Sequence, residues 1–180
     1  MKRKDFIKQS MWVGATAFTL PALGNTLKNT NSKEALDPKI IRSDEGKTIN
    51  VLGDIQTFKL TGKDTNGLFT LIEEYNTPGT MIPPHVHTKE DEIFKVLEGE
   101  LELTVGDKTT ILKAGDLAFG PRNVPHSWKV VGDTNAKVIL SVFPAGIEDM
   151  FEELGALPPG PPDMEKVMEI CARQGISFLK

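Results

Sequence analysis

Apolar residues in the middle of the chain occur in short runs separated by turn residues. Between positions 49 and 143 the runs are broken by pairs such as Gly53-Asp54, Asn66-Gly67, Gly106-Asp107 and Gly132-Asp133. Short strands joined by turns at this spacing are typical of a β-sandwich or barrel and not of a βαβ fold. The sequence therefore predicts an all-β domain.

Two segments show the patterns of individual strands. Residues 100–105 alternate, so that Leu101, Leu103 and Val105 share one face of a strand while the other face meets solvent. Residues 137–143 form a denser apolar run with β-branched side chains. Such a run predicts a strand that is buried on both faces.

After Gly146 the apolar period changes to that of a helix. A stripe with spacing i, i+3, i+4 and i+7 precedes Gly155 and consists of Ile147, Met150, Phe151 and Leu154. A second helix is predicted between a capping Asp163 and Gly175, with a stripe of Met164, Val167, Met168 and Cys171. We expect this extension, residues 147–180, either to cover a face of the barrel or to form the contact of a homodimer.

The first 24 residues have the three parts of a bacterial export signal. Four basic residues lie within the first ten, residues 11–23 are uncharged, and Ala22-Leu23-Gly24 resembles a cleavage site. The apolar run is shorter than the ~20 residues that span a bilayer, and a buried amphipathic helix is the alternative. Arg3-Lys4 resembles the start of a twin-arginine signal with lysine at the second position. The sequence predicts export, to the periplasm of a bacterium.

Length and charge narrow the function classes. With 180 residues, the chain has room for one domain, which we place at residues 49–146 after a polar arm at 25–48. The net charge is −4, and residues 1–24 hold four basic residues and one acidic residue, so the remainder carries about −7. An acidic surface without basic clusters excludes nucleic acid and, once the signal is removed, anionic membranes as partners.

Candidate chemistry is confined to a few side chains. The single cysteine, Cys171, excludes a disulfide framework and Cys-rich metal sites, which leaves nitrogen and oxygen ligands. His85 and His87 are two apart, so on a strand both imidazoles face the same side and can share a metal ion. Glu92 and His126 could approach from neighbouring strands. Each of these residues, taken alone, is also compatible with a surface or hydrogen-bonded role.

The spacing of these residues resembles the motifs of the cupin superfamily of small double-stranded β-helix barrels. The first cupin motif matches at Gly79, His85, His87, Glu92 and Gly99, and the second matches at Gly115, Pro121 and His126. The inner glycine of the second motif is replaced by Asn123, which tolerates a left-handed backbone, and its closing asparagine by Val130. The resemblance implies a jelly-roll-like barrel with two short C-terminal helices added.

The resemblance also implies that three histidines and one glutamate bind a metal ion directly: His85, His87, Glu92 and His126. Imidazole and carboxylate ligands suit one divalent transition metal, and iron, nickel, manganese, copper, cobalt and zinc all remain open. Strand parity places Phe94, Val96, Leu103 and Trp128 inside the barrel. They predict an apolar substrate pocket in which the metal is the main polar feature, or they simply fill a small barrel.

The single barrel with its Pro-rich C-terminal helices looks like bacterial quercetin dioxygenase-like cupins. This resemblance implies an oxidoreductase that directs dioxygen onto an aromatic small molecule, phenolic or flavonol-like, with Glu92 as catalytic base. One alternative is a cupin that binds a small molecule without turnover. Another is a metal-dependent isomerase or decarboxylase, which needs an inward base such as Glu74 or Tyr75.

Overall fold

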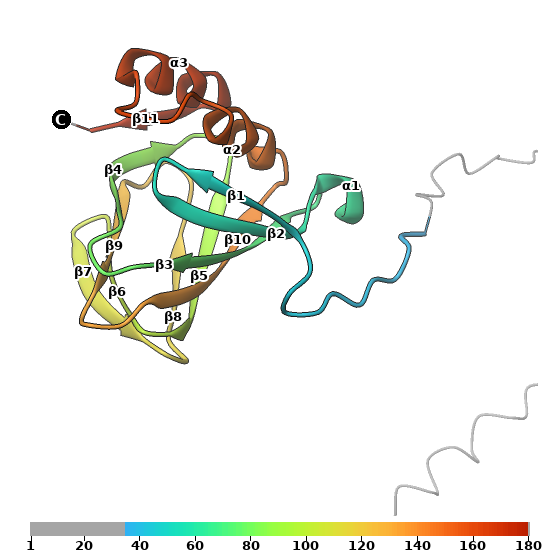
Figure 1. The fold of residues 1–180 in the computed structure, drawn as a ribbon, viewed down its shortest axis with the longest axis horizontal. Coiled ribbons are helices and arrows are strands. Elements are labelled where there is room, and N and C mark those ends of the chain that lie inside the picture. The colour runs from blue at the N-terminus through green and yellow to red at the C-terminus, as the bar shows by residue number, and fades with distance from the viewer. Residues whose placement is uncertain (1–34, 180) are drawn as a thin grey trace, which may run out of the picture. The chain divides into compact units, whose positions relative to one another are not determined.

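The computed structural model describes residues 35–179, which contain eleven strands and three short helices (Figure 1). The export signal predicted for residues 1–24 and the first ten residues of the predicted arm lie outside this range. One sheet has the order β1-β2-β3-β10-β5-β8, with bounds Lys47–Val51, Asp54–Leu60, Thr70–Asn76, Ala136–Phe143, Asp91–Glu98 and Leu117–Gly120. The other has the order β11-β4-β9-β6-β7, with bounds Ile176–Phe178, Met81–His87, His126–Val131, Glu100–Val105 and Lys108–Lys113.

Every strand pair in the two sheets is antiparallel, which confirms the predicted all-β barrel class. Side chains alternate across the strands as the sequence pattern requires. On β5, Phe94 and Val96 are buried, whereas Lys95 between them is only partly buried. On β9, Trp128 is buried and the neighbouring Lys129 is exposed. The inward side chains form one continuous apolar core.

The prediction that residues 137–143 are buried on both faces is wrong in part. Strand β10 lies between β3 and β5, and its buried side chains are Ala136, Val138, Leu140 and Val142. The alternate residues, including Ile139, are only half buried. The central position of β10 in its sheet explains the apolar run, but no second layer covers its outer face completely.

The two predicted C-terminal helices are present. Helix α2 (Ile147–Gly155) and helix α3 (Met164–Gln174) follow a short α1 (Gly62–Thr65) near the start of the domain. The Asp163 side chain accepts hydrogen bonds from the first turn of α3, and Gly175 ends the helix with a left-handed φ of 93°. Both caps agree with the sequence prediction.

The buried stripe of α3 differs from the predicted one. Val167, Ile170 and Cys171 face the core, whereas Met164 and Met168 are 54% and 51% exposed. Val167, Ile170 and Cys171 are spaced i, i+3 and i+4, so they lie on one side of the helix. The two methionines therefore lie beside the contact surface and not in it.

Helices α2 and α3 lie over one end of the barrel, next to β1 and β4 (Figure 1). Their connection back to the sheet is β11, which the sequence pattern did not reveal. Ile176 pairs with His87 and Phe178 pairs with His85, so the last strand is added to the edge of β4. The extension thus closes the barrel at the end where the predicted ligands lie.

Residues 35–46 form no helix or strand, and β1 begins at Lys47, two residues inside the predicted arm. This segment is held to the barrel by lysine contacts. The ammonium of Lys59 donates hydrogen bonds of 2.7 Å to the carbonyls of Ser43 and Glu45, and Lys39 pairs with Asp64. No helix within residues 35–179 is long and apolar enough to cross a membrane.

Candidate metal centre

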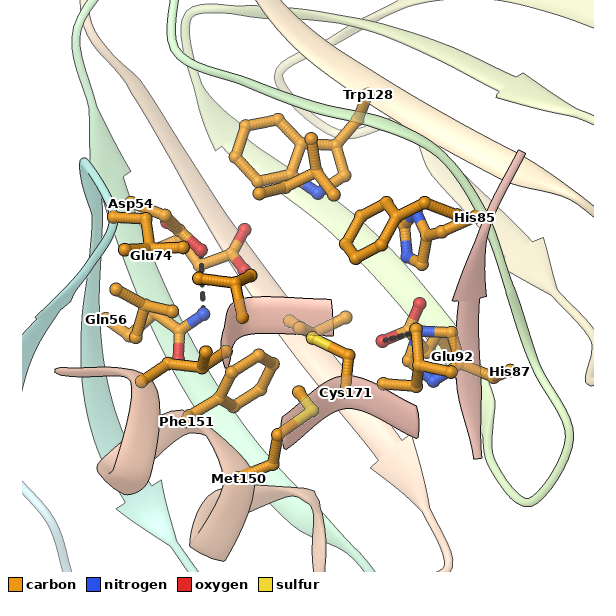
Figure 2. A pocket seen from close by; sticks show the side chains of 18 of the residues that line it. Asp54, Gln56, Glu74, His85, His87, Glu92, Trp128, Met150, Phe151 and Cys171 are labelled. Carbon is orange, nitrogen blue, oxygen red and sulfur yellow. Dashed lines mark hydrogen bonds and ion pairs between the residues drawn. The ribbon is translucent and has the colours of Figure 1, made fainter. Parts of the chain in front are cut away.

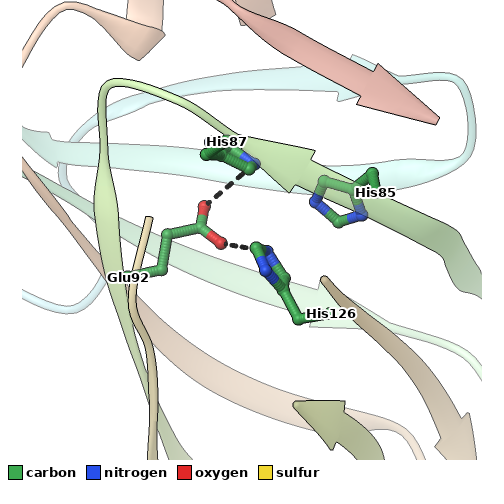
Figure 3. Close-up of side chains that lie close together, drawn as sticks. All are labelled: His85, His87, Glu92 and His126. Carbon is green, nitrogen blue, oxygen red and sulfur yellow. Dashed lines mark ion pairs between the residues drawn. The ribbon is translucent and has the colours of Figure 1, made fainter. Parts of the chain in front are cut away.

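The four residues predicted as metal ligands come together at the closed end of the barrel (Figure 3). His85 and His87 lie on β4, Glu92 on β5 and His126 on β9. Antiparallel pairing of β4 with β9 places His85 directly opposite His126. One potential ligand atom from each residue lies within 4.8 Å of all the others, and all four side chains are buried. The structure therefore brings together every predicted ligand.

Backbone carbonyls fix the orientation of two imidazoles. His85 Nδ1 donates to the Pro83 carbonyl oxygen at 2.8 Å, and His126 Nδ1 donates to the Val124 carbonyl oxygen at 3.2 Å. A carbonyl can only accept, so each Nδ1 carries the proton and each Nε2 keeps a lone pair. An imidazole that binds a metal through Nε2 must have this tautomer.

A carboxylate lies near the third imidazole without hydrogen-bonding to it, because His87 Nδ1 and Glu90 Oε2 are both buried without a hydrogen-bond partner in the described chain. Glu90 Oε2 lies 3.4 Å from His87 Nδ1, and Gln174 Nε2 at the end of α3 donates to Glu90 Oε1 at 2.7 Å. Glu90 is only 2% exposed, although it belongs to an acidic run with Asp91 and Glu92. The contact connects the C-terminal helix to a ligand, and no local sequence signal marks it because Gln174 is 84 residues away.

The charges at the centre favour a neutral His85 and an ionised Glu92. Burial, together with the neighbouring His126 and His87, lowers the pKa of His85 to about 4. Burial opposes ionisation of Glu92, but interactions with His126 and the other imidazoles outweigh it and lower the pKa. Burial likewise opposes protonation of His126, and the Glu92 carboxylate outweighs it and raises that pKa.

The donor set fits a divalent transition metal. His126 Nε2 lies 2.8 Å from Glu92 Oε2 (Figure 3), yet it is buried without a hydrogen-bond partner of suitable geometry in the described chain. His87 Nε2 lies 3.9 Å from Glu92 Oε1. Buried polar atoms that lack a partner are rare in native proteins and call for an explanation. A cation bound between three imidazole nitrogens and a carboxylate supplies one.

Loop contacts join the two motifs that carry the ligands. Arg122, shortly before His126, donates from two side-chain nitrogens to the carboxylate of Asp91, at 3.1 and 2.7 Å. The amide of Asn123 donates to the His87 carbonyl at 2.7 Å. Asn123 has a left-handed φ of 64°, as expected for asparagine in place of the family's glycine.

A cavity of about 90 Å³ adjoins the centre (Figure 2). Two of the predicted pocket residues, Phe94 and Trp128, line it, as do His85, His87 and Glu92. The other two, Val96 and Leu103, do not: Val96 lies four residues beyond Glu92 on β5, about 13 Å along the strand, and Leu103 packs in the same barrel core. The predicted pocket thus extended too far into the packed core.

Side chains from the C-terminal extension cover this cavity. They belong to α2, α3 and β11 and include Met150, Phe151, Leu154, Val167, Cys171, Ile176 and Phe178. The barrel strands alone therefore do not define the site. Its apolar cap was missed because the sequence pattern shows that the helices are amphipathic but not which end of the barrel they meet.

The metal centre is not the only polar part of the cavity. Asp54, Gln56 and Glu74 lie on its opposite side, on β2 and β3 (Figure 2). The expectation of an apolar interior whose main polar feature is the metal is therefore wrong in part, because a second polar cluster lines the cavity. Of these residues, the sequence singled out only Glu74. Asp54 and Gln56 alternate with apolar residues in a strand that has polar residues on both faces, so their inward direction could not be inferred.

Comparison with known proteins identifies similar sequences and folds. A family model described as a cupin domain matches residues 74–143. Quercetin 2,3-dioxygenase of Bacillus subtilis is 33% identical over 93 residues, which cover 52% of this chain and 28% of that protein. Germin-like protein 5-1 of Oryza sativa subsp. japonica is 35% identical over 130 residues, which cover 66% of this chain and 58% of that protein.

Among solved structures, KdgF from a Halomonas species has a similar fold. Its TM-score is 0.56 at 18% identity, with 63% of this chain and 99% of that chain covered. At this identity the likeness concerns the fold alone. The chain spans only 28% and 58% of the two curated relatives, so the similarity concerns their barrel regions and not the complete proteins.

Proposed function

Because the chain belongs to the cupin superfamily, we propose that it is a metal-dependent oxidoreductase that directs dioxygen onto a small organic molecule. One divalent transition metal is held by His85, His87, Glu92 and His126. The observation that carries the proposal is the convergence of these buried side chains beside a cavity, with two imidazoles oriented by backbone carbonyls. The substrate binds through an enolate or phenolate oxygen.

The ligand count leaves room for substrate. Four protein ligands leave one or two positions of an octahedral ion open, and mixed imidazole and carboxylate ligands suit iron, nickel, manganese, copper, cobalt or zinc. When bound, the ion supplies a Lewis acid for the substrate oxygen and, where it is redox-active, the electrons that oxygen chemistry needs.

Glu92 is the residue that we assign to proton transfer. The Nδ1 atoms of His85 and His126 are committed to carbonyls and their Nε2 atoms face the metal position. Glu92 is an ionised carboxylate with its pKa lowered by the imidazoles, and it lines the cavity. With a metal bound, Glu92 would be both a ligand and the carboxylate placed to accept the proton of a substrate hydroxyl.

The size of the cavity limits the substrate. A cavity of roughly 150 Å³ is sufficient for benzene, whereas this one has about 90 Å³. A flavonol is several times larger and does not fit beneath α2 and α3 as they stand. We therefore favour a small enolisable or hydroxylated compound, and a phenolic ring requires an outward shift of Phe151 and its neighbours.

A metal-dependent isomerase or decarboxylase is the second candidate, and one observation favours it. Such an enzyme needs a proton-carrying group besides the metal ligands, and Glu74 lines the same cavity. A cupin that binds the same ligand without turnover would also use this site.

Oxygen uptake separates these functions. Protein loaded with iron, nickel, manganese or copper is mixed without oxygen with a panel of small enediols, hydroxy acids and phenols, and air is then admitted. The proposal expects uptake with at least one metal and substrate and little uptake by Glu92→Gln. Conversion without oxygen uptake supports the isomerase or decarboxylase, and binding without either reaction supports the non-catalytic function.

We also propose that the barrel works after export to the bacterial periplasm, on the basis of the signal pattern in residues 1–24. Fractionation of the native cells, followed by N-terminal sequencing, should find periplasmic protein that begins near residue 25. Full-length protein confined to the cytoplasm would contradict this.

A further inference from the structure

The cavity has a second polar end, formed by residues on β2 and β3 that face the metal centre across it (Figure 2). Gln56 and Glu74 are only 1% and 3% exposed. They lie opposite each other on adjacent strands, at a paired position of the β2–β3 ladder. Buried polar groups of this kind are normally satisfied by partners inside the protein.

Asp54 has such partners, but its neighbours are incompletely satisfied. Gln56 Nε2 donates to Asp54 Oδ2 at 2.7 Å, and Asn76 Nδ2 donates to Asp54 Oδ1 at 2.6 Å. Both oxygens of Asp54 therefore accept amide protons, as a carboxylate does. Gln56 Oε1, in contrast, is buried without a hydrogen-bond partner. The side chain of Glu74 forms no hydrogen bond or ion pair with any of residues 35–179, although its backbone pairs with β2 and β10.

Glu74 is expected to be a neutral carboxylic acid in this setting. Burial raises its pKa well above the usual value, and the charges of Asp54 and Glu92 raise it further. A protonated carboxyl offers one O–H donor. The residues that line the cavity therefore include a free donor on Glu74 and an unpaired acceptor, Oε1, on Gln56.

We infer that Glu74 and Gln56 form a binding subsite for a hydroxyl group at the end of the ligand remote from the metal. A hydroxyl there can accept from the Glu74 acid, and the paired residue Gln56 holds an acceptor, Oε1, that has no other partner in the described chain. The inference rests on the proposed function, because the other end of the ligand binds the metal through an oxygen. It narrows the substrate class to small compounds that carry an oxygen ligand at one end and a hydroxyl at the other.

Other ligand ends suit this subsite less well. An anionic group would be repelled by the buried Asp54 carboxylate, and an apolar group would leave the donor and the acceptor unpaired. Sites that are built to hydrogen-bond a hydroxyl reject analogues that lack it much more strongly than apolar pockets reject a missing methylene group. The hydroxyl therefore determines specificity in this cavity.

Calorimetric titration of zinc-loaded protein tests the subsite without turnover. The probes are matched acids that differ by one hydroxyl: β-hydroxypropionate against propionate, and γ-hydroxybutyrate against butyrate. We expect at least one hydroxy acid to bind about ten-fold or more tightly than its partner. Equal affinities within both pairs, or no binding of any probe by protein that holds zinc, would overturn the inference.

Two variants assign the preference to Glu74. Glu74→Leu removes the donor and should bring the affinity ratio close to one, whereas Glu74→Gln keeps an N–H donor and should retain part of the preference. If Glu74→Leu does not fold, the affinity ratios of wild type and Glu74→Gln for the matched acids still test the inference. A ratio unchanged in a folded Glu74→Leu would contradict the assignment, while failure of wild-type protein to bind zinc would contradict the proposed function instead.

Discussion

Replacing Glu74 by glutamine should change the pH dependence of folding stability in a defined direction. Glu74 is buried on β3, and burial together with the charges of Asp54 and Glu92 raises its pKa in the folded protein. The folded state then binds more protons than the unfolded state between the unfolded and the folded pKa. Wild-type stability contributed by this group is complete below the unfolded pKa and is lost as the pH rises through the folded pKa.

The size of the effect follows from linkage. Each unit by which the folded pKa exceeds the unfolded one corresponds to about 1.4 kcal/mol. For a domain of this size, 1 kcal/mol shifts Tm by about 2–4 °C. Glu74→Gln, which carries no charge, should therefore be about 3–6 °C more stable than wild type per unit of pKa difference at pH 8, and close to wild type near pH 4.5.

Thermal and urea denaturation of metal-free protein between pH 4.5 and 8.5 measures this difference. Glu102→Gln is the matched control, because Glu102 lies half buried on β6, with its neighbours Leu101 and Leu103 facing the core. A difference between Glu74→Gln and wild type that stays constant with pH, or shrinks as the pH rises, would refute the reasoning.

Three further substitutions test the cap, a turn and a helix end. Phe151→Ala should enlarge the cavity beneath α2 and allow zinc-loaded protein to bind catechol in calorimetry. It should lower the free energy of unfolding by about 3 kcal/mol or less, because the ring is only half buried. Catechol binding equal to that of wild type would contradict the role of the cap. Gly99→Ala should lower the free energy of unfolding, measured with urea, by more than about 2 kcal/mol, because its φ is 73° and a Cβ would lie 2.5 Å from the Asn135 carbonyl oxygen. Gly106→Ala should lower it less, because its Cβ would approach only Val124, at 3.7 Å. Equal losses in the two variants would show that backbone strain alone matters. Asp163→Ala should lower stability by about 1 kcal/mol through loss of the α3 cap, and a neutral result would mean that the cap contributes nothing.

The barrel and the pair of histidines on β4 could be predicted because both depend on short-range spacing. His85 and His87 are two apart on one strand, and parity alone places them on the same side. Glu92 and His126 were placed through the family resemblance, and the pairing of β4 with β9 confirms their arrangement. Asn123 was expected to adopt a left-handed backbone and does so.

The cap and the second polar end could not be predicted, since both depend on contacts between distant segments. Pairing of β11 with β4 brings Phe178 beside His85, and a three-residue strand has no periodicity of its own. Asp54 and Gln56 belong to a strand whose polar residues normally indicate solvent. Only the position of β2 beside β3 shows that they line the cavity.

The central claim is that three histidines and one glutamate hold a metal ion, and the metal content of the purified protein tests it most directly. Wild type, His87→Ala, Glu92→Gln and the control Glu102→Gln are purified in parallel, equilibrated with one divalent metal, dialysed and analysed by mass spectrometry for metal per chain. The account predicts one ion per chain in wild type and in Glu102→Gln, and strongly reduced metal in His87→Ala and Glu92→Gln. Wild-type protein without bound metal, or equal metal content in all four proteins, would contradict it.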